Sequence, residues 1–167
     1  MLDVAQRARG IRLLILDVDG VLTDGGLYFG PDGAEWKRFH VHDGTGIRAV
    51  RQAGIQVALV SGRSSQTVER RAAELEVNYV IQGEADKGRA LGQLRAEAGL
   101  PDAAVAAVGD DLADLPMLEA VGLAVAVADA HPRVKTAAHW VTAASGGQGA
   151  VREVCDLLLE TAATPRG

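Results

Sequence analysis

The sequence has one cysteine, Cys155, and no block of basic residues. A single cysteine excludes an internal disulfide framework and favours a reducing compartment. The formal net charge of −5, with arginines scattered among acids, disfavours nonspecific binding to nucleic acid. No segment is apolar over the roughly 18 residues that a membrane span needs, and residues 1–10 lack the apolar core of a secretory signal. We therefore expect a cytoplasmic protein that binds neither membranes nor nucleic acid.

The chain is also poor in low-complexity sequence, internal repeats and linkers, so we expect one globular domain over residues 1–167. Short apolar runs at 13–16, 55–60, 79–81, 105–108, 123–127 and 140–142 predict strands, because they show no polar alternation. Helical patterns separate them at 47–53, 66–75 and 87–98, after Pro132 and after Gly149. This alternation predicts an α/β fold, a Rossmann-like parallel sheet with helices on both faces.

Aromatic residues make up only 4% of the chain, and most of them gather in one segment, residues 25–42. The turn sequence Gly30-Pro31-Asp32-Gly33 lies in its middle, which predicts a projecting β-hairpin. An isolated hairpin is marginally stable in water, so we expect its aromatic side chains to pack on another subunit. The i, i+2 spacing of His40 and His42 places them on one face of the second arm, as a polar face toward ligand or solvent. A zinc site is disfavoured because no third ligand is near.

Polar side chains stand where three of the predicted strands end. Asp17 and Asp19 follow the first strand, Ser61 the second, and Asp110-Asp111 with Asp114 the fourth, while Lys87 begins a helix. Right-handed crossovers bring such ends to one edge of a parallel sheet. Taken singly, each residue has a plain structural explanation: an Asp/Gly turn, a helix cap or a solvated lysine. Together they meet the needs of phosphoryl transfer.

Phosphoryl transfer requires a divalent cation, an in-line nucleophile and donors for the phosphoryl oxygens. Asp17 and Asp110, with a backbone carbonyl, offer the hard oxygen ligands that Mg²⁺ prefers. The Ser61 hydroxyl and the Lys87 ammonium are donors for phosphoryl oxygens. A carboxylate nucleophile forms an aspartyl-phosphate, and a second carboxylate two residues on, Asp19, can protonate the leaving oxygen and then activate water.

These residues stand in the order of the four motifs of the haloacid dehalogenase superfamily, which the chain resembles. Further segments resemble one family within it, the 3-deoxy-D-manno-octulosonate 8-phosphate (KDO 8-phosphate) phosphatases, over about residues 11–160. Those segments begin at Phe39, Val68, Val125 and Gly149. Gln148 departs from the pattern, since that family has an arginine in the corresponding glycine-rich stretch.

The resemblance implies Mg²⁺-dependent hydrolysis of KDO 8-phosphate, a step of lipopolysaccharide biosynthesis, by a phosphoric monoester hydrolase. It implies that Asp17 is the nucleophile and a metal ligand, and that Asp19 is the acid/base and a ligand through its carbonyl oxygen. Asp110 would be the third ligand, with Asp111 and Asp114 behind it. Ser61 and Lys87 would hold the phosphoryl group. The sugar acid would meet the remaining implied residues: His40, Val41, His42, Asp43, Gly44, Arg48, Gly62, Arg63 and Arg71.

The resemblance also implies a protein without a large cap domain that forms a homotetramer. Hairpins and C-terminal tails of neighbouring subunits, here about residues 25–42 and 146–167, would help to close the sites. Three alternatives stay open. The substrate could be a nine-carbon acid sugar 9-phosphate of a nonulosonate pathway. The chain could be a non-hydrolysing, Mg²⁺-binding phospho-acceptor like a receiver domain, or a catalytically silent assembly module, which the complete acid set disfavours.

Overall fold

The computed structural model describes residues 3–162, and these build a six-stranded sheet in the order β5-β4-β1-β6-β7-β8. Every neighbouring pair in this sheet is parallel. The strands are β1 (Leu13–Asp17), β4 (Gln56–Ser61), β5 (Tyr79–Gln82), β6 (Val105–Gly109), β7 (Leu123–Ala126) and β8 (Trp140–Val141). The predicted strands therefore exist with ends shifted by one residue or so, and the parallel α/β architecture is confirmed.

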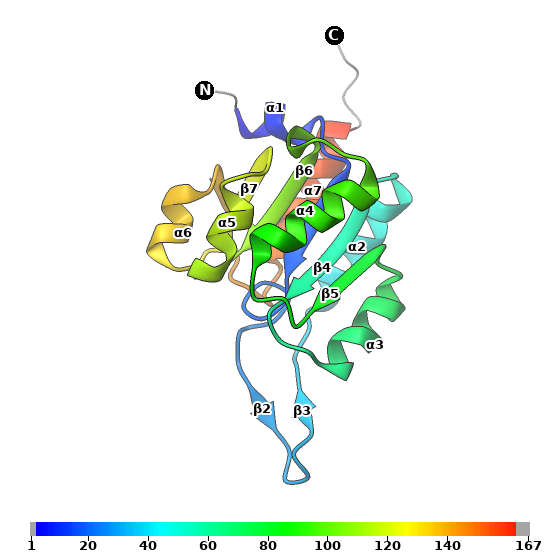
Figure 1. Cartoon of the computed structure of the whole chain (residues 1–167), viewed down its shortest axis with the longest axis vertical. Helices are drawn as coiled ribbons and strands as arrows, with labels where there is room; N and C mark the ends of the chain where they lie inside the picture. The colour runs from blue at the N-terminus through cyan, green and yellow to red at the C-terminus, as the bar shows by residue number, and fades with distance from the viewer. Residues whose placement is uncertain (1–2, 163–167) are drawn as a thin grey trace.

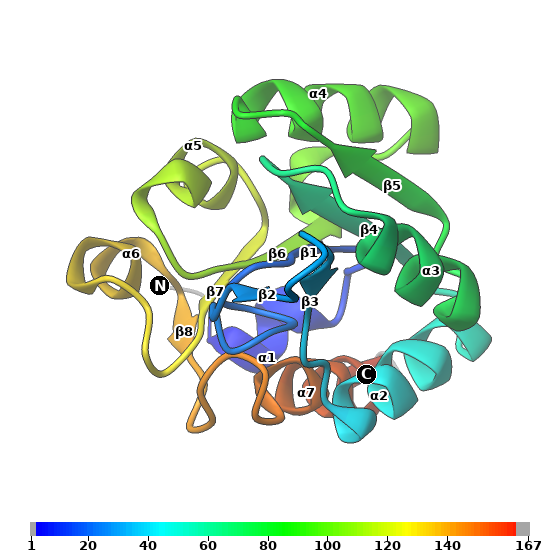
Figure 2. The same cartoon turned by 90° about the horizontal axis from the view of Figure 1, so that it is seen from below.

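Helices cover both faces of the sheet. They are α1 (Val4–Ala8), α2 (Val41–Gln52), α3 (Gln66–Leu75), α4 (Lys87–Ala98), α5 (Leu115–Leu118), α6 (Pro132–Ala137) and α7 (Ala150–Ala162), with short 3-10 turns η1 (Asp102–Ala104) and η2 (Leu112–Asp114). Figure 2 shows α1, α2 and α7 on one face and α4 and α5 on the other. None of the helices in the described range is long and apolar enough to cross a membrane.

The central strands are buried because both of their faces carry aliphatic side chains. Every residue of β1 and β6 is buried, and β1 lies between β4 and β6, with Leu14 opposite Val57 and Ala106. Burial of this kind contributes about 25 cal/mol per Å² of apolar surface. The core therefore holds β1 rigidly, and the carboxyl ends of β1, β4 and β6 meet at one edge.

A two-stranded hairpin, β2 (Tyr28–Phe29) and β3 (Glu35–Trp36), projects from that edge (Figure 1). The predicted turn forms at its tip, where the Gly30 N–H donates to the Ala34 carbonyl oxygen at 2.8 Å. Its ladder is only two residues long on each arm, much shorter than the segment 25–42 that the sequence predicts. Its aromatic side chains are left open: Phe29 is 63% exposed and Trp36 61%.

One prediction for this segment is wrong. His40 and His42 do not share a strand face, because helix α2 begins at Val41, with His40 as its N-cap. The sequence predicts a helix only over residues 47–53, whereas α2 also includes Gly44 and Gly46, although glycine is a poor helix former. Tertiary contacts explain the difference. A Cβ on Gly44 would lie 2.4 Å from Arg71 Nη2, so a glycine here lets the helix approach α3 closely.

Candidate active site

Asp17, the last residue of β1, lies at the centre of the carboxyl edge. It is 7% exposed, and one of its oxygens accepts a hydrogen bond from the Lys87 ammonium. Asp110 follows the adjacent strand β6, and Asp114 lies one turn further on. One carboxylate oxygen from each of these three aspartates lies within 4.8 Å of the others. The strands thus bring together residues that are far apart in the sequence, as predicted.

Lys87 reaches this cluster from the first turn of α4. Its Nζ also donates to Asp114 Oδ1 at 3.0 Å and to the Val60 carbonyl oxygen at 3.1 Å. Burial opposes the charge on the ammonium group, but Asp17 and Asp114 outweigh that effect and raise the pKa of Lys87. Lys87 is therefore a buried, charged donor at the cluster, and the alternative of a solvated surface lysine is wrong.

Asp114 shapes the loop after β6. It is 2% exposed, and its Oδ2 accepts the N–H groups of Asp110 and Asp111 at 2.9 and 3.1 Å. Since its Oδ1 accepts from Lys87, both oxygens already have partners. The neighbouring Asp111 is exposed and caps η2 through the Leu112 N–H at 2.8 Å.

The cluster carries more negative charge than Lys87 neutralises. Burial, and then the charge of Asp114, raises the pKa of Asp17 from 3.8 to about 7. Burial, with Asp17 and Asp114, raises the pKa of Asp110 to about 8. Two carboxylates this close favour a bound proton or a cation between them.

A magnesium ion fits this donor set. Asp17 and Asp110 present carboxylate oxygens, which Mg²⁺ prefers, and their raised pKa values report an unmet need for positive charge. Asp114 belongs to the same cluster, although the sequence predicts it only as a supporting residue behind Asp110. Because its oxygens serve Lys87 and two backbone N–H groups, we assign it to holding Asp110 and Lys87 in position.

Glycine is required where the loop after β1 meets Asp110. Gly20 has φ +97°, and an added Cβ would lie 2.1 Å from Asp110 Oδ2. The glycine of the Asp17-Val18-Asp19-Gly20 motif therefore allows the backbone to pass directly beside the Asp110 carboxylate.

Ser61 ends β4 on the other side of β1, and it is 2% exposed. Its Oγ accepts the Arg63 N–H at 3.1 Å, which folds the 61–63 loop over the strand end. The Arg63 side chain reaches away to the hairpin, where Nη2 pairs with Glu35 Oε2 at 2.7 Å. The loop thus presents Ser61 and Gly62 beside the cluster and links it to β3.

Asp19 does not join the three clustered carboxylates through its side chain. Its Oδ1 pairs with Lys37 Nζ at 2.5 Å, and Lys37 also pairs with Glu35 Oε1 at 2.7 Å. The sequence analysis did not single out Lys37 or Glu35. The alternation Glu35-Trp36-Lys37 could have indicated them, because in a strand it places the charged side chains of Glu35 and Lys37 on one face and Trp36 on the other.

Most of the residues implied for the sugar acid lie around the start of α2 and on α3. Val41 is 77% exposed, and the rings of His40 and His42 are 5.0 Å apart. Arg48 and Arg71 pair with the two oxygens of Glu74, at 3.3 and 2.9 Å. No ion pair among residues 3–162 joins either arginine to an aspartate of the cluster.

Asp43, another implied contact of the sugar acid, lies inside the molecule instead. It is 1% exposed, and its Oδ1 accepts the Arg152 N–H at 2.8 Å in the first turn of α7. Burial raises the pKa of Asp43. The side chain thus ties α2 to the beginning of α7.

Comparison with known proteins agrees with this geometry. A model of the haloacid dehalogenase-like hydrolases matches residues 79–154. The 3-deoxy-D-manno-octulosonate 8-phosphate phosphatase of Escherichia coli (strain K12) is 52% identical over 157 residues, covering 94% of this chain and 84% of that protein.

Solved structures agree as well. The phosphatase of the same name from Yersinia pestis is 50% identical with a TM-score of 0.94, covering 96% of this chain and 86% of that one. The one from Moraxella catarrhalis is 40% identical with a TM-score of 0.93, covering 95% and 91%. It was solved in complex with a magnesium ion, a phosphate ion and KDO.

Proposed function

Because this chain belongs to the 3-deoxy-D-manno-octulosonate 8-phosphate phosphatases of the haloacid dehalogenase-like hydrolases, we propose that it hydrolyses KDO 8-phosphate to KDO and phosphate. The whole chain, residues 1–167, acts as one catalytic domain. The observation that carries the proposal is the cluster of Asp17, Asp110, Asp114 and Lys87 at the carboxyl edge of the sheet.

In the first step, Asp17 attacks the phosphorus and the bond to the C8 oxygen of the sugar breaks. Asp19 gives its proton to that leaving oxygen, so the sugar acid departs with a neutral hydroxyl group at C8 and Asp17 carries the phosphoryl group. Ser61, with the backbone N–H groups of its loop, and Lys87 hold the phosphoryl oxygens whose charge the transfer redistributes.

In the second step, Asp19, now a carboxylate, takes a proton from water as the water oxygen attacks the phosphorus. The bond between phosphorus and the Asp17 oxygen breaks, which releases phosphate and restores both aspartates. A phospho-acceptor like a receiver domain lacks a carboxylate in the position of Asp19, so its acyl phosphate persists. A phosphatase needs this carboxylate to activate water.

Mg²⁺ supplies charge neutralisation at the phosphoryl group when it is bound, held by Asp17, Asp110 and the carbonyl oxygen of Asp19. Asp114 and Asp111 lie behind these ligands. The phosphatase of Moraxella catarrhalis was solved in complex with a magnesium ion, a phosphate ion and KDO, which supports the choice of Mg²⁺.

The sugar acid carries a carboxylate besides the phosphate, and the start of α2 and the 61–63 loop supply groups to meet it. We assign Arg63 to the carboxylate, because its side chain is 47% exposed and its planar guanidinium keeps N–H donors for a second carboxylate besides that of Glu35. The other proposed contacts are His40, Val41, His42, Gly44, Arg48, Gly62 and Arg71. Asp43 acts through the position of α2, since it is buried.

The protein forms a homotetramer in this proposal. The hairpin projects into solvent with Leu27, Tyr28, Phe29 and Trp36 each more than 40% exposed, which supports a contact with a second copy. The proposed tail contact of residues 146–167 extends past residue 162, where the described part of the chain ends. The single buried cysteine supports a cytoplasmic location.

The deciding experiment is a comparison of kcat/KM for KDO 8-phosphate and for a nine-carbon acid sugar 9-phosphate, with Mg²⁺. We expect the eight-carbon substrate to be preferred. A preference for the nine-carbon substrate would leave the proposed phosphatase mechanism intact but would overturn the assignment of KDO 8-phosphate as the substrate.

Asp17→Asn is the control for the chemistry, because it keeps the side chain's shape and removes the nucleophile. We expect turnover to fall by about 10³-fold or more. An Asp17→Asn variant with near wild-type turnover would overturn the mechanism. A stable phosphorylated wild-type protein without turnover would favour the phospho-acceptor alternative.

A further inference from the structure

The hairpin delivers a charged side chain to the catalytic loop, and we propose that this residue, Lys37, is a positioning residue for Asp19. The inference rests on the proposed phosphatase function and adds a residue to its proton-transfer step. Lys37 has a side chain 1% exposed, although it lies on an arm whose neighbouring residue Trp36 is 61% exposed.

Lys37 is held from two sides. Its Nζ lies 2.5 Å from Asp19 Oδ1 and 2.7 Å from Glu35 Oε1, so the ammonium group bridges two carboxylates. Burial opposes the charge on Lys37, but the hydrogen bonds with Asp19 and Glu35 outweigh it and raise the pKa of the ammonium group. The two ion pairs therefore fix the position of the Lys37 side chain between Asp19 and Glu35.

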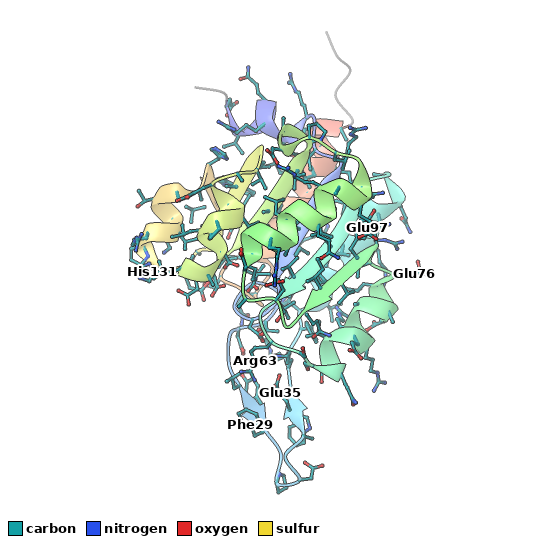
Figure 3. The ribbon with its side chains drawn as sticks, in the orientation of Figure 1. Phe29, Glu35, Arg63, Glu76, Glu97 and His131 are labelled. Carbon is teal, nitrogen blue, oxygen red and sulfur yellow. The ribbon has the colours of Figure 1, made fainter. Side chains whose placement is uncertain are left out.

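The bridge continues to the phosphoryl-binding loop. Glu35 Oε2 pairs with Arg63 Nη2 at 2.7 Å, and the Arg63 N–H donates to Ser61 Oγ at 3.1 Å. Figure 3 shows Glu35 and Arg63 close together, with Glu35 part-way along the hairpin. One chain of charged contacts thus joins Asp19, β3 and the loop after β4.

This arrangement leaves one oxygen of Asp19 for chemistry. Lys37 occupies Oδ1, and no residue within 3–162 donates a hydrogen bond to Oδ2. Holding the carboxyl group by one oxygen restricts its rotation and gives Oδ2 a defined place for the proton of the leaving oxygen. A misplacement of about 1 Å costs on the order of 100-fold in rate, so a fixed carboxyl group matters.

The test uses a series of substituted phenyl phosphates, from phenyl to p-nitrophenyl phosphate, with the intact Mg²⁺-loaded protein. Nitrophenolate leaves without a proton, whereas the leaving oxygen of phenyl phosphate gains from one. We expect Lys37→Met to lower kcat/KM about 10- to 100-fold for phenyl phosphate and less than about threefold for p-nitrophenyl phosphate. The dependence of kcat/KM on the leaving group therefore steepens.

Two variants complete the design. Lys135→Met makes the same replacement on α6, away from the cluster, and should leave the series unchanged. Lys37→Arg keeps the charge and should recover part of the loss with phenyl phosphate. Lys37→Gln replaces Lys37→Met in the series if the latter does not fold.

The outcomes separate the possibilities. A uniform loss over all phenyl phosphates would show that Lys37 supports the fold or contacts the substrate, and an unchanged series would show that it has no role. Either result overturns the assignment while leaving the phosphatase function intact. A wild-type protein that releases no phosphate from any substrate would overturn the proposed function itself.

Discussion

Removing Mg²⁺ should make the stability of this protein fall as pH rises, which is unusual for a protein rich in carboxylates. The reason is Asp17, whose pKa rises from 3.8 to about 7 because the carboxyl group is buried next to Asp114. When the pKa of a carboxyl group is higher in the folded state, the folded state binds more protons between the two values. Stability is then fully present at low pH and is lost as pH rises through the folded-state value.

The magnitude follows from the shift. The difference between about 7 and 3.8 corresponds to about 4 kcal/mol at about 1.4 kcal/mol per pH unit, lost between pH 4 and pH 8. This figure is for Asp17 alone; Asp110, whose pKa is raised to about 8 by burial and by the neighbouring aspartates, adds to the loss at higher pH. Mg²⁺ replaces the protons at pH 8, so adding it should recover most of the loss.

The assay is urea unfolding at pH 5 and pH 8, each with a chelator and with saturating Mg²⁺. Asp17→Asn should be more stable than wild type at pH 8 without metal, and should lose much of the pH dependence. Asp102→Asn, which removes a carboxylate before β6 at the opposite end of the sheet, should keep the wild-type dependence. A metal-free wild-type protein whose stability stays flat or rises between pH 5 and pH 8 would refute the reasoning.

Three further outcomes are expected. Lys87→Met should lower the free energy of unfolding by about 3–5 kcal/mol in the metal-free protein at pH 8, and by less at pH 5, where Asp17 takes a proton; urea titrations at both pH values check this. Asp43→Ala should cost about 1–2 kcal/mol by uncapping α7, while Asp43→Asn keeps the acceptor and most of the stability; equal losses would contradict the capping role. Phe29→Ala combined with Trp36→Ala should weaken the proposed tetramer, as measured by light scattering, and leave the free energy of unfolding of the subunit nearly unchanged.

The elements of the sheet could be predicted because each depends on local pattern. Helices α3 (Gln66–Leu75) and α4 (Lys87–Ala98) have the bounds that the sequence indicates, and the strands are apolar runs bounded by polar turns. The start of α2 could not be predicted in this way. Its glycines become helical because Arg71 and α7 pack against them, and these partners lie far away along the chain.

The site divides along the same line. The sequence predicts that four residues lie together, because each stands at the end of a strand or the start of a helix and a parallel sheet brings these ends to one edge: Asp17, Ser61, Lys87 and Asp110. The sequence could not predict Lys37 as part of the site, because Lys37 lies 18 positions after Asp19 and tertiary packing sets the path of the loop and hairpin between them. Asp43 has its partner 109 residues away in α7, so no local pattern distinguishes a buried cap from a residue that meets substrate.

The two lysines at the site contact different aspartates, which the proposed mechanism places at the attacking oxygen and at the leaving oxygen. Lys87 comes from α4 inside the domain and contacts Asp17, so in the proposed mechanism it would act on the nucleophile and the phosphoryl group, which every phosphate ester shares. Lys37 follows β3 on the hairpin and contacts Asp19, so in the proposed mechanism it would act on the leaving oxygen, where substrates differ. Contacts that order the hairpin therefore act first on the departure of the sugar. In this proposal, the residues that act on the phosphoryl group are held by the core of the sheet, and the residue that positions the acid for the leaving group is held by the hairpin.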